Sequence, residues 1–134
     1  MQLQVEARLG EDLANHDLSL ADYLVLATLS DQIDGKLRIV ELGNELGWEK
    51  SRVSHQITRM ANRGLVEKQR CLTDGRGFFV VVTDHGRACA ESAAPNHVKL
   101  VRKLVIDQLS ESELKTIRKV AERVLSNIDH GVGA

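Results

Sequence analysis

Two short apolar stripes, separated by a tight turn and followed by a glycine-rich hairpin, constrain the fold of this chain most strongly. Each stripe has three apolar residues at helical spacing and ends at a glycine, the residue that most often follows the end of a helix. The stripes are Ile39, Leu42 and Leu46 before Gly47, and Val53, Ile57 and Met60 before Gly64. The pattern therefore predicts two short helices joined by a tight turn, each with one apolar side.

Two runs of strand-forming residues follow the second helix, over residues 65–72 and 78–82. Residues 73–77 between them have the sequence Thr-Asp-Gly-Arg-Gly, which is a hairpin signal. Helix, helix and hairpin in this order are typical of a winged helix-turn-helix domain.

Helical patterns flank this arrangement on both sides. Upstream, apolar spacing predicts a helix over residues 20–31 with Ser19 as its cap, and a looser helical pattern covers residues 3–14. Downstream, residues 84–109 consist largely of alanine and long-chain helix formers. Pro95 lies inside this stretch and is expected to kink the helix or divide it in two.

The last apolar stripe has the spacing of a helix that packs against another helix. Its members recur three and four residues apart: Leu114, Ile117, Ala121, Val124 and Ile128. Such a stripe more often belongs to the core of its own chain, but the compact winged domain is expected to end near Thr83. Pairing with a second copy of the chain is therefore the economical way to bury the stripe.

Charge is distributed unevenly along the chain. The 134 residues carry a net charge of -1, which argues against a protein covered all over in basic residues. Residues 50–76 nevertheless contain seven basic residues and two acidic ones, a net charge of +5, so the rest of the chain carries -6. Such a segment is typical of a localised anion-binding face, although a solvated helix surface can also be basic.

The second short helix carries hydrogen-bonding side chains on the side opposite to Val53. With about 3.6 residues per turn, this side holds Ser51, Arg52, His55, Thr58, Arg59 and Asn62. A helix in the major groove of DNA needs such a surface, because arginine pairs with guanine edges and Ser, Thr and Asn contact bases or phosphates. Ser51, Arg52 and His55 lie in the first turns, which enter the groove deepest, whereas Arg63 lies nearer the DNA backbone or the exit of the groove. A polar face that is simply turned to solvent is the alternative.

The hairpin tip supplies a further basic side chain. Arg76 lies between Gly75 and Gly77, so its side chain projects from a narrow turn that can approach DNA closely. An arginine on so thin a probe suits the minor groove, where negative potential is concentrated. Asp74 can pair with Arg76 and orient it, or it can simply initiate the turn.

Taken together, these residues resemble the MarR family of bacterial transcription regulators. The matching positions run through nearly the whole chain in the order of the family, and the Asp-x-Arg pair of the wing is the most specific of them. The positions are Leu18, Ser19, Asp22, Tyr23, Val25, Leu26, Glu41, Leu42, Leu46, Ser51, Val53, Ser54, Met60, Arg63, Gly64, Leu65, Val66, Asp74, Arg76, Val82, Thr83 and Gly86.

The resemblance implies a mainly α-helical protein with a small β-hairpin wing, a winged helix-turn-helix with N- and C-terminal dimerisation helices. The implied parts are an N-terminal dimerisation helix over residues 1–18, a DNA-binding domain over 19–83 and C-terminal dimerisation helices over 84–134. Such a homodimer is expected to repress transcription at a pseudo-palindromic operator in double-stranded DNA. Its recognition helix, about residues 50–63, would enter the major groove, and its wing, about residues 72–77, the minor groove.

The resemblance also implies a set of contact residues and a signal. The expected DNA contacts are Ser51, Arg52, Ser54, His55, Thr58, Arg59, Arg63, Asp74 and Arg76. DNA binding in this family is commonly relieved by a small aromatic or phenolic effector, and in some branches by thiol oxidation or a metal. An effector pocket is expected between the winged domain and the dimer helices, near Tyr23 and Trp48, although both aromatics are more typical of core packing.

Residues for other kinds of chemistry are scarce. We find no nucleophile with a base at useful spacing and no phosphate-cradling loop, so no enzymatic activity or cofactor is expected. Cys71 and Cys89 are too few for a disulfide framework or a four-ligand metal site. We therefore expect both to be structural thiols, in a protein of a reducing compartment. Glu6, Glu11 and Asp12 interrupt the apolar core that a signal peptide needs, and no apolar run is long enough to span a membrane, so the protein is expected to be cytoplasmic.

One alternative function fits the same pattern of helices. A winged domain can serve as a protein–protein interaction module, with the stripe over residues 112–128 recruiting a different partner. That alternative predicts no salt-dependent binding to duplex DNA.

Overall fold

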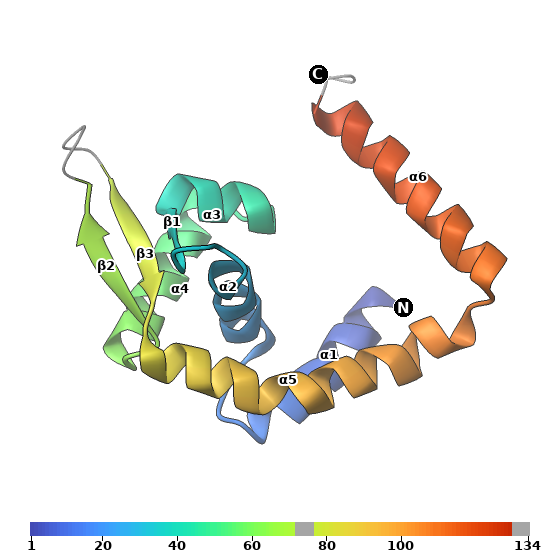
Figure 1. Cartoon of the computed structure of the whole chain (residues 1–134), viewed down its shortest axis with the longest axis horizontal. Helices are drawn as coiled ribbons and strands as arrows, with labels where there is room; N and C mark the ends of the chain where they lie inside the picture. The colour runs from blue at the N-terminus through green and yellow to red at the C-terminus, as the bar shows by residue number, and fades with distance from the viewer. Residues whose placement is uncertain (72–76, 130–134) are drawn as a thin grey trace. The chain divides into compact units, whose positions relative to one another are not determined.

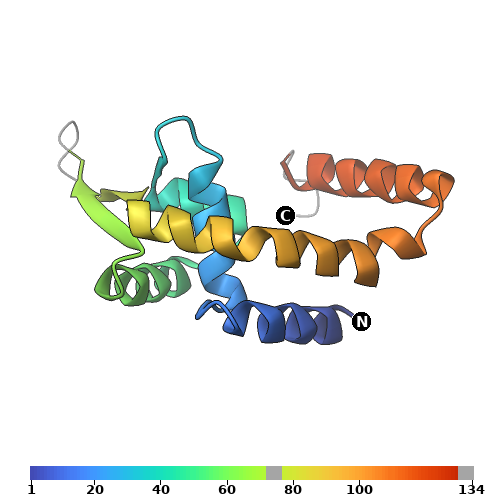
Figure 2. The same cartoon turned by 60° about the horizontal axis from the view of Figure 1, so that its bottom comes forward.

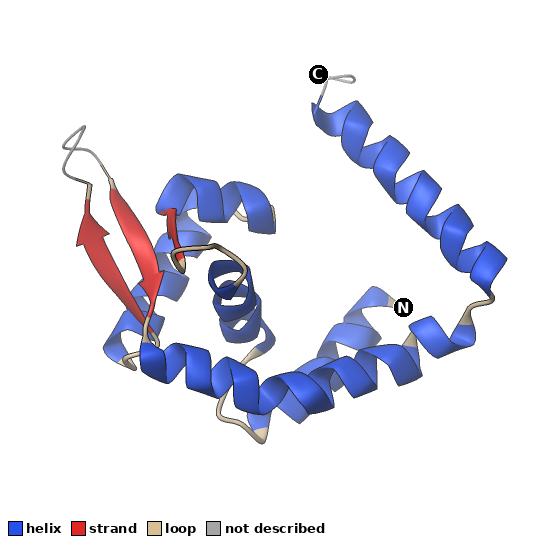
Figure 3. Ribbon diagram, in the orientation of Figure 1, coloured by secondary structure: helices blue, strands red, loops and turns tan. Residues whose placement is uncertain are grey.

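The computed structural model describes residues 1–71 and 77–129. Asp74 and Arg76, both predicted to act in the wing, lie outside the described residues. The chain divides into two compact units, residues 1–97 and 98–134, which are described separately here. Helices predominate, and the described strands all belong to the first unit (Figure 3).

The first unit contains most of the elements labelled in Figure 1. Its elements are α1 (Gln2–Ala14), α2 (Leu20–Ser30), β1 (Lys36–Arg38), α3 (Ile39–Leu46), α4 (Lys50–Asn62), β2 (Val66–Arg70), β3 (Phe78–Val82) and the first part of α5 (Asp84–Leu104). The second unit contains the rest of α5, the short 3-10 helix η1 (Ile106–Gln108) and α6 (Glu111–Asp129). This mainly helical architecture with a small antiparallel sheet confirms the predicted fold class.

The sheet has three antiparallel strands in the order β1-β3-β2. Strands β2 and β3 form the predicted hairpin, with Val66 opposite Val82 and Arg70 opposite Phe78, and they project beyond the helices α2 to α4 (Figures 1 and 2). Strand β1 was not predicted, because it has three residues of which only Leu37 is apolar. Its residues become a strand through pairing with β3, which places Leu37 opposite Val80.

The core of the first unit lies where α2, α3 and α4 meet the sheet. The stripe of α4 is buried as predicted, with Val53 1% exposed and Ile57 and Met60 completely covered. On α3, Leu42 is buried and Leu46 packs against the core from a half-buried position. Burying such side chains contributes about 2 kcal/mol each, which is what holds these short helices in place.

The predicted starts and ends of these helices have a clear chemical basis. Helix α2 begins with a capping box in which Ser19 and Asp22 each bond the other's backbone N–H at 3.0 Å. Helix α3 ends at Gly47, which has the left-handed φ of 68° that glycine adopts without strain. The turn that follows therefore leaves α3 in a fixed direction and leads directly into α4.

Of the two effects predicted for Pro95, a kink or a division of the helix, the division does not occur. The helix continues from Asp84 to Leu104, so it tolerates the loss of the one backbone hydrogen bond that proline cannot donate. The interruption comes instead beyond Val105, where η1 replaces regular helix before α6 begins.

Helix α6 leaves its apolar stripe uncovered within the chain. Ile117 is 51% exposed, and Val124 and Ile128 are more exposed still. Neither α6 nor any other helix in residues 1–71 and 77–129 combines the length and the apolar character needed to cross a membrane.

Candidate nucleic-acid interface

Helix α4 separates a buried side from a polar, exposed side, as the helical pattern predicts. Six hydrogen-bonding residues lie on the polar side, and all of them are exposed: Ser51, Arg52, His55, Thr58, Arg59 and Asn62. Ser54 is half-buried, so it lies at the edge of this surface. The helix therefore presents a continuous row of donors that protein packing leaves open.

The first turn of α4 is built for an anion. It contains Lys50 and Arg52 and no acidic residue, and the N-cap residue Glu49 makes no side-chain hydrogen bond there. The N-terminal end of a helix carries unpaired N–H groups and a partial positive charge, so two basic side chains at this end reinforce the same sign. Such a helix end suits a phosphate or another negatively charged group.

The guanidinium of Arg52 stacks on the indole of Trp48, 4.2 Å from the ring centroid. Trp48 belongs to the turn between α3 and α4, where its backbone N–H donates to the carbonyl of Gly43 at 3.0 Å. Gly47, one residue earlier, donates to Asn44, which completes the usual helix-ending pair of hydrogen bonds. Trp48 was expected to pack in the core or to lie near an effector pocket, and the structure shows it half-buried against the core and in contact with Arg52.

A buried carboxylate fixes α4 against α2. Asp22 is 4% exposed and accepts hydrogen bonds from Gln56 at 2.6 Å and from Arg63 at 2.7 Å. The second guanidinium nitrogen of Arg63 donates to the carbonyl of Asp17. We call Asp22, Gln56 and Arg63 the α2–α4 clamp.

The cap of α2 and the clamp together determine the charge state of Asp22. Burial alone would raise the pKa of this carboxyl, but the Ser19 backbone N–H and the Arg63 guanidinium outweigh burial and hold the pKa below its usual value. Asp22 is therefore ionised at neutral pH, and Arg63 is its ion-pair partner. This geometry gives Arg63 a structural role in addition to the DNA contact expected from the sequence, because its side chain remains 43% exposed.

Gln56 extends the clamp to the exposed face of α4. Its amide oxygen accepts a hydrogen bond from the guanidinium of Arg59 at 2.9 Å, while its amide nitrogen donates to Asp22. Gln56 is 5% exposed. It was not predicted as a functional residue, because it lies on the side of the helix that the apolar spacing marks as buried. The spacing of Gln56 three residues before Arg59 was the available signal.

The wing strands add a basic residue that the sequence analysis did not select. The ammonium of Lys68 on β2 donates to the hydroxyl of Thr58 at 3.0 Å and lies 5.3 Å from the centroid of Phe78. Lys68 thereby joins the base of the wing to the exposed face of α4. The positive charge of this surface thus comes from β2 as well as from the helix.

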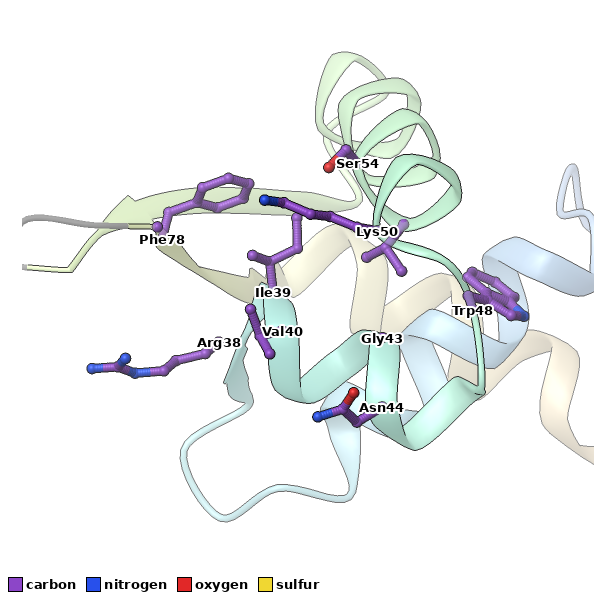
Figure 4. Close-up of a pocket in the computed structure, with 11 residues that line it drawn as sticks. Arg38, Ile39, Val40, Gly43, Asn44, Trp48, Lys50, Ser54 and Phe78 are labelled. Atoms are coloured by element: carbon purple, nitrogen blue, oxygen red, sulfur yellow. The ribbon is translucent and has the colours of Figure 1, made fainter. Parts of the chain in front are cut away.

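A pocket of about 510 Å³ lies between α3, the start of α4 and the wing (Figure 4). Ser54 contributes to its wall, and the side chain of Lys50 extends across it toward Phe78 in this view. The lining residues are Arg38, Ile39, Val40, Gly43, Asn44, Trp48, Lys50, Val53, Ser54, Gly77 and Phe78. Ser54 is therefore positioned beside the polar row of α4 and not within it.

The two aromatic positions considered for an effector differ in their surroundings. The ring of Tyr23 contacts that of His97, with 4.4 Å between centroids. Burial lowers the pKa of His97, and a weaker opposing effect comes from the charge of Asp12. Trp48 instead lines a second cleft, of about 830 Å³, between α1, α2 and the turn before α4.

The thiols and histidines form no metal site in the described ranges 1–71 and 77–129. No group of three or more His, Cys, Asp or Glu side chains gathers there. Cys71 is buried and accepts a hydrogen bond from Arg38, with 3.2 Å between the two atoms. Cys89 is half-buried, and its sulfur lies 3.8 Å from the ring of His85.

Comparison with known proteins finds relatives in one family of transcriptional regulators. A family model described as MarR family matches residues 16–77. The structure is similar to AbsC, a MarR family transcriptional regulator from Streptomyces coelicolor, at 34% identity and a TM-score of 0.90, covering 96% of this chain and 87% of that one. It is also similar to Sco3205, a MarR family transcriptional regulator from the same organism in complex with DNA, at 28% identity and a TM-score of 0.88, covering 94% and 79%. A mutant of MarR from E. coli, complexed with operator DNA, matches at 24% identity and a TM-score of 0.81, covering 92% and 87%.

Proposed function

Because the chain belongs to the MarR family of transcriptional regulators, which are DNA-binding proteins and not enzymes, we propose that it represses transcription at a pseudo-palindromic operator as a homodimer. The protein acts in the cytoplasm, and its operator is a segment of double-stranded DNA. The solved complex of Sco3205 with DNA supports this proposal.

The exposed face of α4 is the observation that carries the proposal. It combines a basic first turn with a row of hydrogen-bond donors, and the α2–α4 clamp fixes its direction. In the proposed complex Ser51, Arg52 and His55 reach base edges in the major groove. The other proposed contacts are Ser54, Thr58, Arg59 and Arg63 from α4 and its end, and Asp74 and Arg76 from the wing in the minor groove.

Dimerisation would place two such helices on one face of the DNA. The uncovered stripe of α6 supports pairing with a second copy, because an apolar row of this length is rarely left in water. We assign dimerisation to residues 1–18 and 84–134 and DNA binding to residues 19–83. Two recognition helices spaced by one turn of DNA, roughly 34 Å, would contact the two operator half-sites.

A small aromatic or phenolic molecule is the proposed effector. The cleft of about 830 Å³ is large enough for such a molecule and is lined by both Trp48 and Arg52. An effector in this cleft would contact a proposed DNA-binding side chain directly. The Arg52 side chain could not contact the effector and DNA at the same time, so binding of the effector would weaken binding to DNA.

Titration with DNA from upstream of the protein's own gene tests the proposed function. We expect binding to this DNA to be about a thousandfold tighter than to a scrambled duplex of equal length, which is the lower end of the usual ratio between specific and non-specific DNA binding. The affinity should fall steeply between two salt concentrations, and Arg52→Ala and Arg76→Ala should each weaken it. Equal, weak binding to every duplex would contradict the proposal and favour a protein-interaction module.

A further inference from the structure

We infer that Trp48 is a positioning residue for DNA binding, because its indole ring orients the guanidinium of Arg52 at the start of α4. This role rests on the proposed function, since Arg52 is one of the proposed base contacts. Neither the family pattern in the sequence nor the predicted core role of Trp48 assigns it.

The ring of Trp48 occupies a position that the backbone fixes. Gly47 turns the chain at the end of α3, and the Trp48 N–H is held by the carbonyl of Gly43. The indole packs against the core, and its ring also faces Arg52. The ring is thus a rigid platform beside the first turn of the recognition helix.

Arg52 depends on this platform more than the other arginines of α4 do. Arg59 is held by the amide of Gln56 and Arg63 by the carboxylate of Asp22. Arg52 makes no hydrogen bond or ion pair with the part of the chain that the structure describes, so the indole contact is what restricts its rotamers.

Stacking restrains Arg52 without using its donors. A guanidinium has five N–H groups around its edge, and a ring contact on its face leaves all of them available to a base or a phosphate. A salt bridge would orient the side chain too, but it would neutralise the charge and occupy part of the edge. The ring also stabilises a cation at the positive end of a helix, where Lys50 adds a second like charge.

A double-mutant cycle on DNA affinity tests the inference. The variants are Trp48→Leu, Arg52→Ala and the combination, titrated with DNA from upstream of the protein's own gene. We expect W48L to weaken binding about threefold to fivefold, the effect of losing an exposed cation–π contact, and to have no further effect once Arg52 is alanine. Trp48→Phe, which keeps an aromatic face, should recover most of the lost affinity.

Arg59→Ala is the matched control. Arg59 lies on the same exposed face but is held by Gln56 and not by the ring. W48L should therefore weaken an R59A protein as much as it weakens the wild type. Since Trp48 is the only tryptophan in the chain, its fluorescence emission should shift in R52A and stay unchanged in R59A.

Two results would overturn the inference. If W48L weakened the R52A protein as much as the wild type, Trp48 would act through the fold and not through Arg52. If the wild type bound its operator selectively and W48L left the affinity unchanged, the ring would have no part in binding. Failure of the wild type itself to select operator DNA is a separate result that removes the proposed function and the inference together.

Discussion

The side-chain amide of Gln56 donates a 2.6 Å hydrogen bond to the carboxylate of Asp22, joining α4 to α2. Because Arg63 bonds the same carboxylate about two turns further along, α4 is held at two points against α2. Two attachments on one helix restrict rotation about the helix axis. The clamp therefore determines which side chains of α4 face outward, and with them the surface proposed to contact DNA.

Replacement of Asp22 by Asn should release the clamp. The variant leaves Arg63 without its ion-pair partner, and we expect the free energy of unfolding to fall by about 2 kcal/mol. Urea denaturation measures this change, and DNA affinity should fall with it. Asp17→Asn is the control, because Arg63 bonds the backbone carbonyl of Asp17 and not its carboxylate. A D22N protein as stable as the wild type would contradict the structural role of the clamp.

Stability should fall with acidification in two separate ranges. Burial lowers the pKa of His97, so the unfolded chain takes up this proton first and stability declines as the pH drops below the ordinary value of 6.5. Asp22 has a lowered pKa, so its contribution is fully present above its ordinary value of 3.8 and is lost as the pH falls through the lower folded value.

Urea denaturation at a series of pH values separates the two groups. His97→Gln should flatten the decline that begins near pH 6.5 while leaving the loss below pH 3.8 in place. Asp22→Asn should do the reverse. The assignment of the upper range to His97 would be wrong if H97Q kept the wild-type slope there.

Gly86 and Gly10 should respond to alanine with opposite signs. A Cβ added at Gly86 would lie 2.1 Å from the carbonyl oxygen of Leu65, so backbone must move and we expect a loss of about 2 to 3 kcal/mol. A Cβ at Gly10 meets nothing within 4 Å inside α1, and alanine there should stabilise the protein by about 1 kcal/mol. Thermal unfolding of the two variants distinguishes the cases. A stable G86A protein would contradict the close approach of α5 to Leu65.

The stripe of α6 should hold the proposed dimer together. Ile117→Glu places a charge in the middle of the stripe, and we expect the mass measured by light scattering to fall from two chains to one. DNA affinity should drop by at least roughly tenfold, because a single chain contacts one half-site only. Lys119→Glu lies on the opposite side of α6 and should remain dimeric. An I117E protein that stayed dimeric would place the interface elsewhere.

The spacing of apolar residues and the positions of glycines predicted the buried sides and the ends of the helices. The spacing of Val53, Ile57 and Met60 indicated which side of α4 is buried, and Gly47 indicated where α3 ends. Strand β1 could not be found in this way, because Lys36–Arg38 forms a strand only when β3 is beside it.

The candidate site was predictable in its composition and less so in its connections. The polar row on α4 follows from helical periodicity, but the bond from Gln56 to Asp22 joins residues 34 positions apart. The sequence around a buried glutamine does not indicate which distant residue will accept its hydrogen bond. The stacking of Arg52 on Trp48 was similarly hidden, because an aromatic residue in a turn between helices is usually interpreted as core packing.

Hydroxyl-radical footprinting on the DNA upstream of the protein's own gene tests whether a homodimer binds an operator through α4. We expect two protected regions on one face of the duplex, with centres one helical turn apart, roughly 34 Å. Arg52→Ala should weaken protection in both regions equally, since each recognition helix presents the same residue. Protection of one region only, or uniform protection along the duplex, would contradict sequence-specific binding by a homodimer through α4.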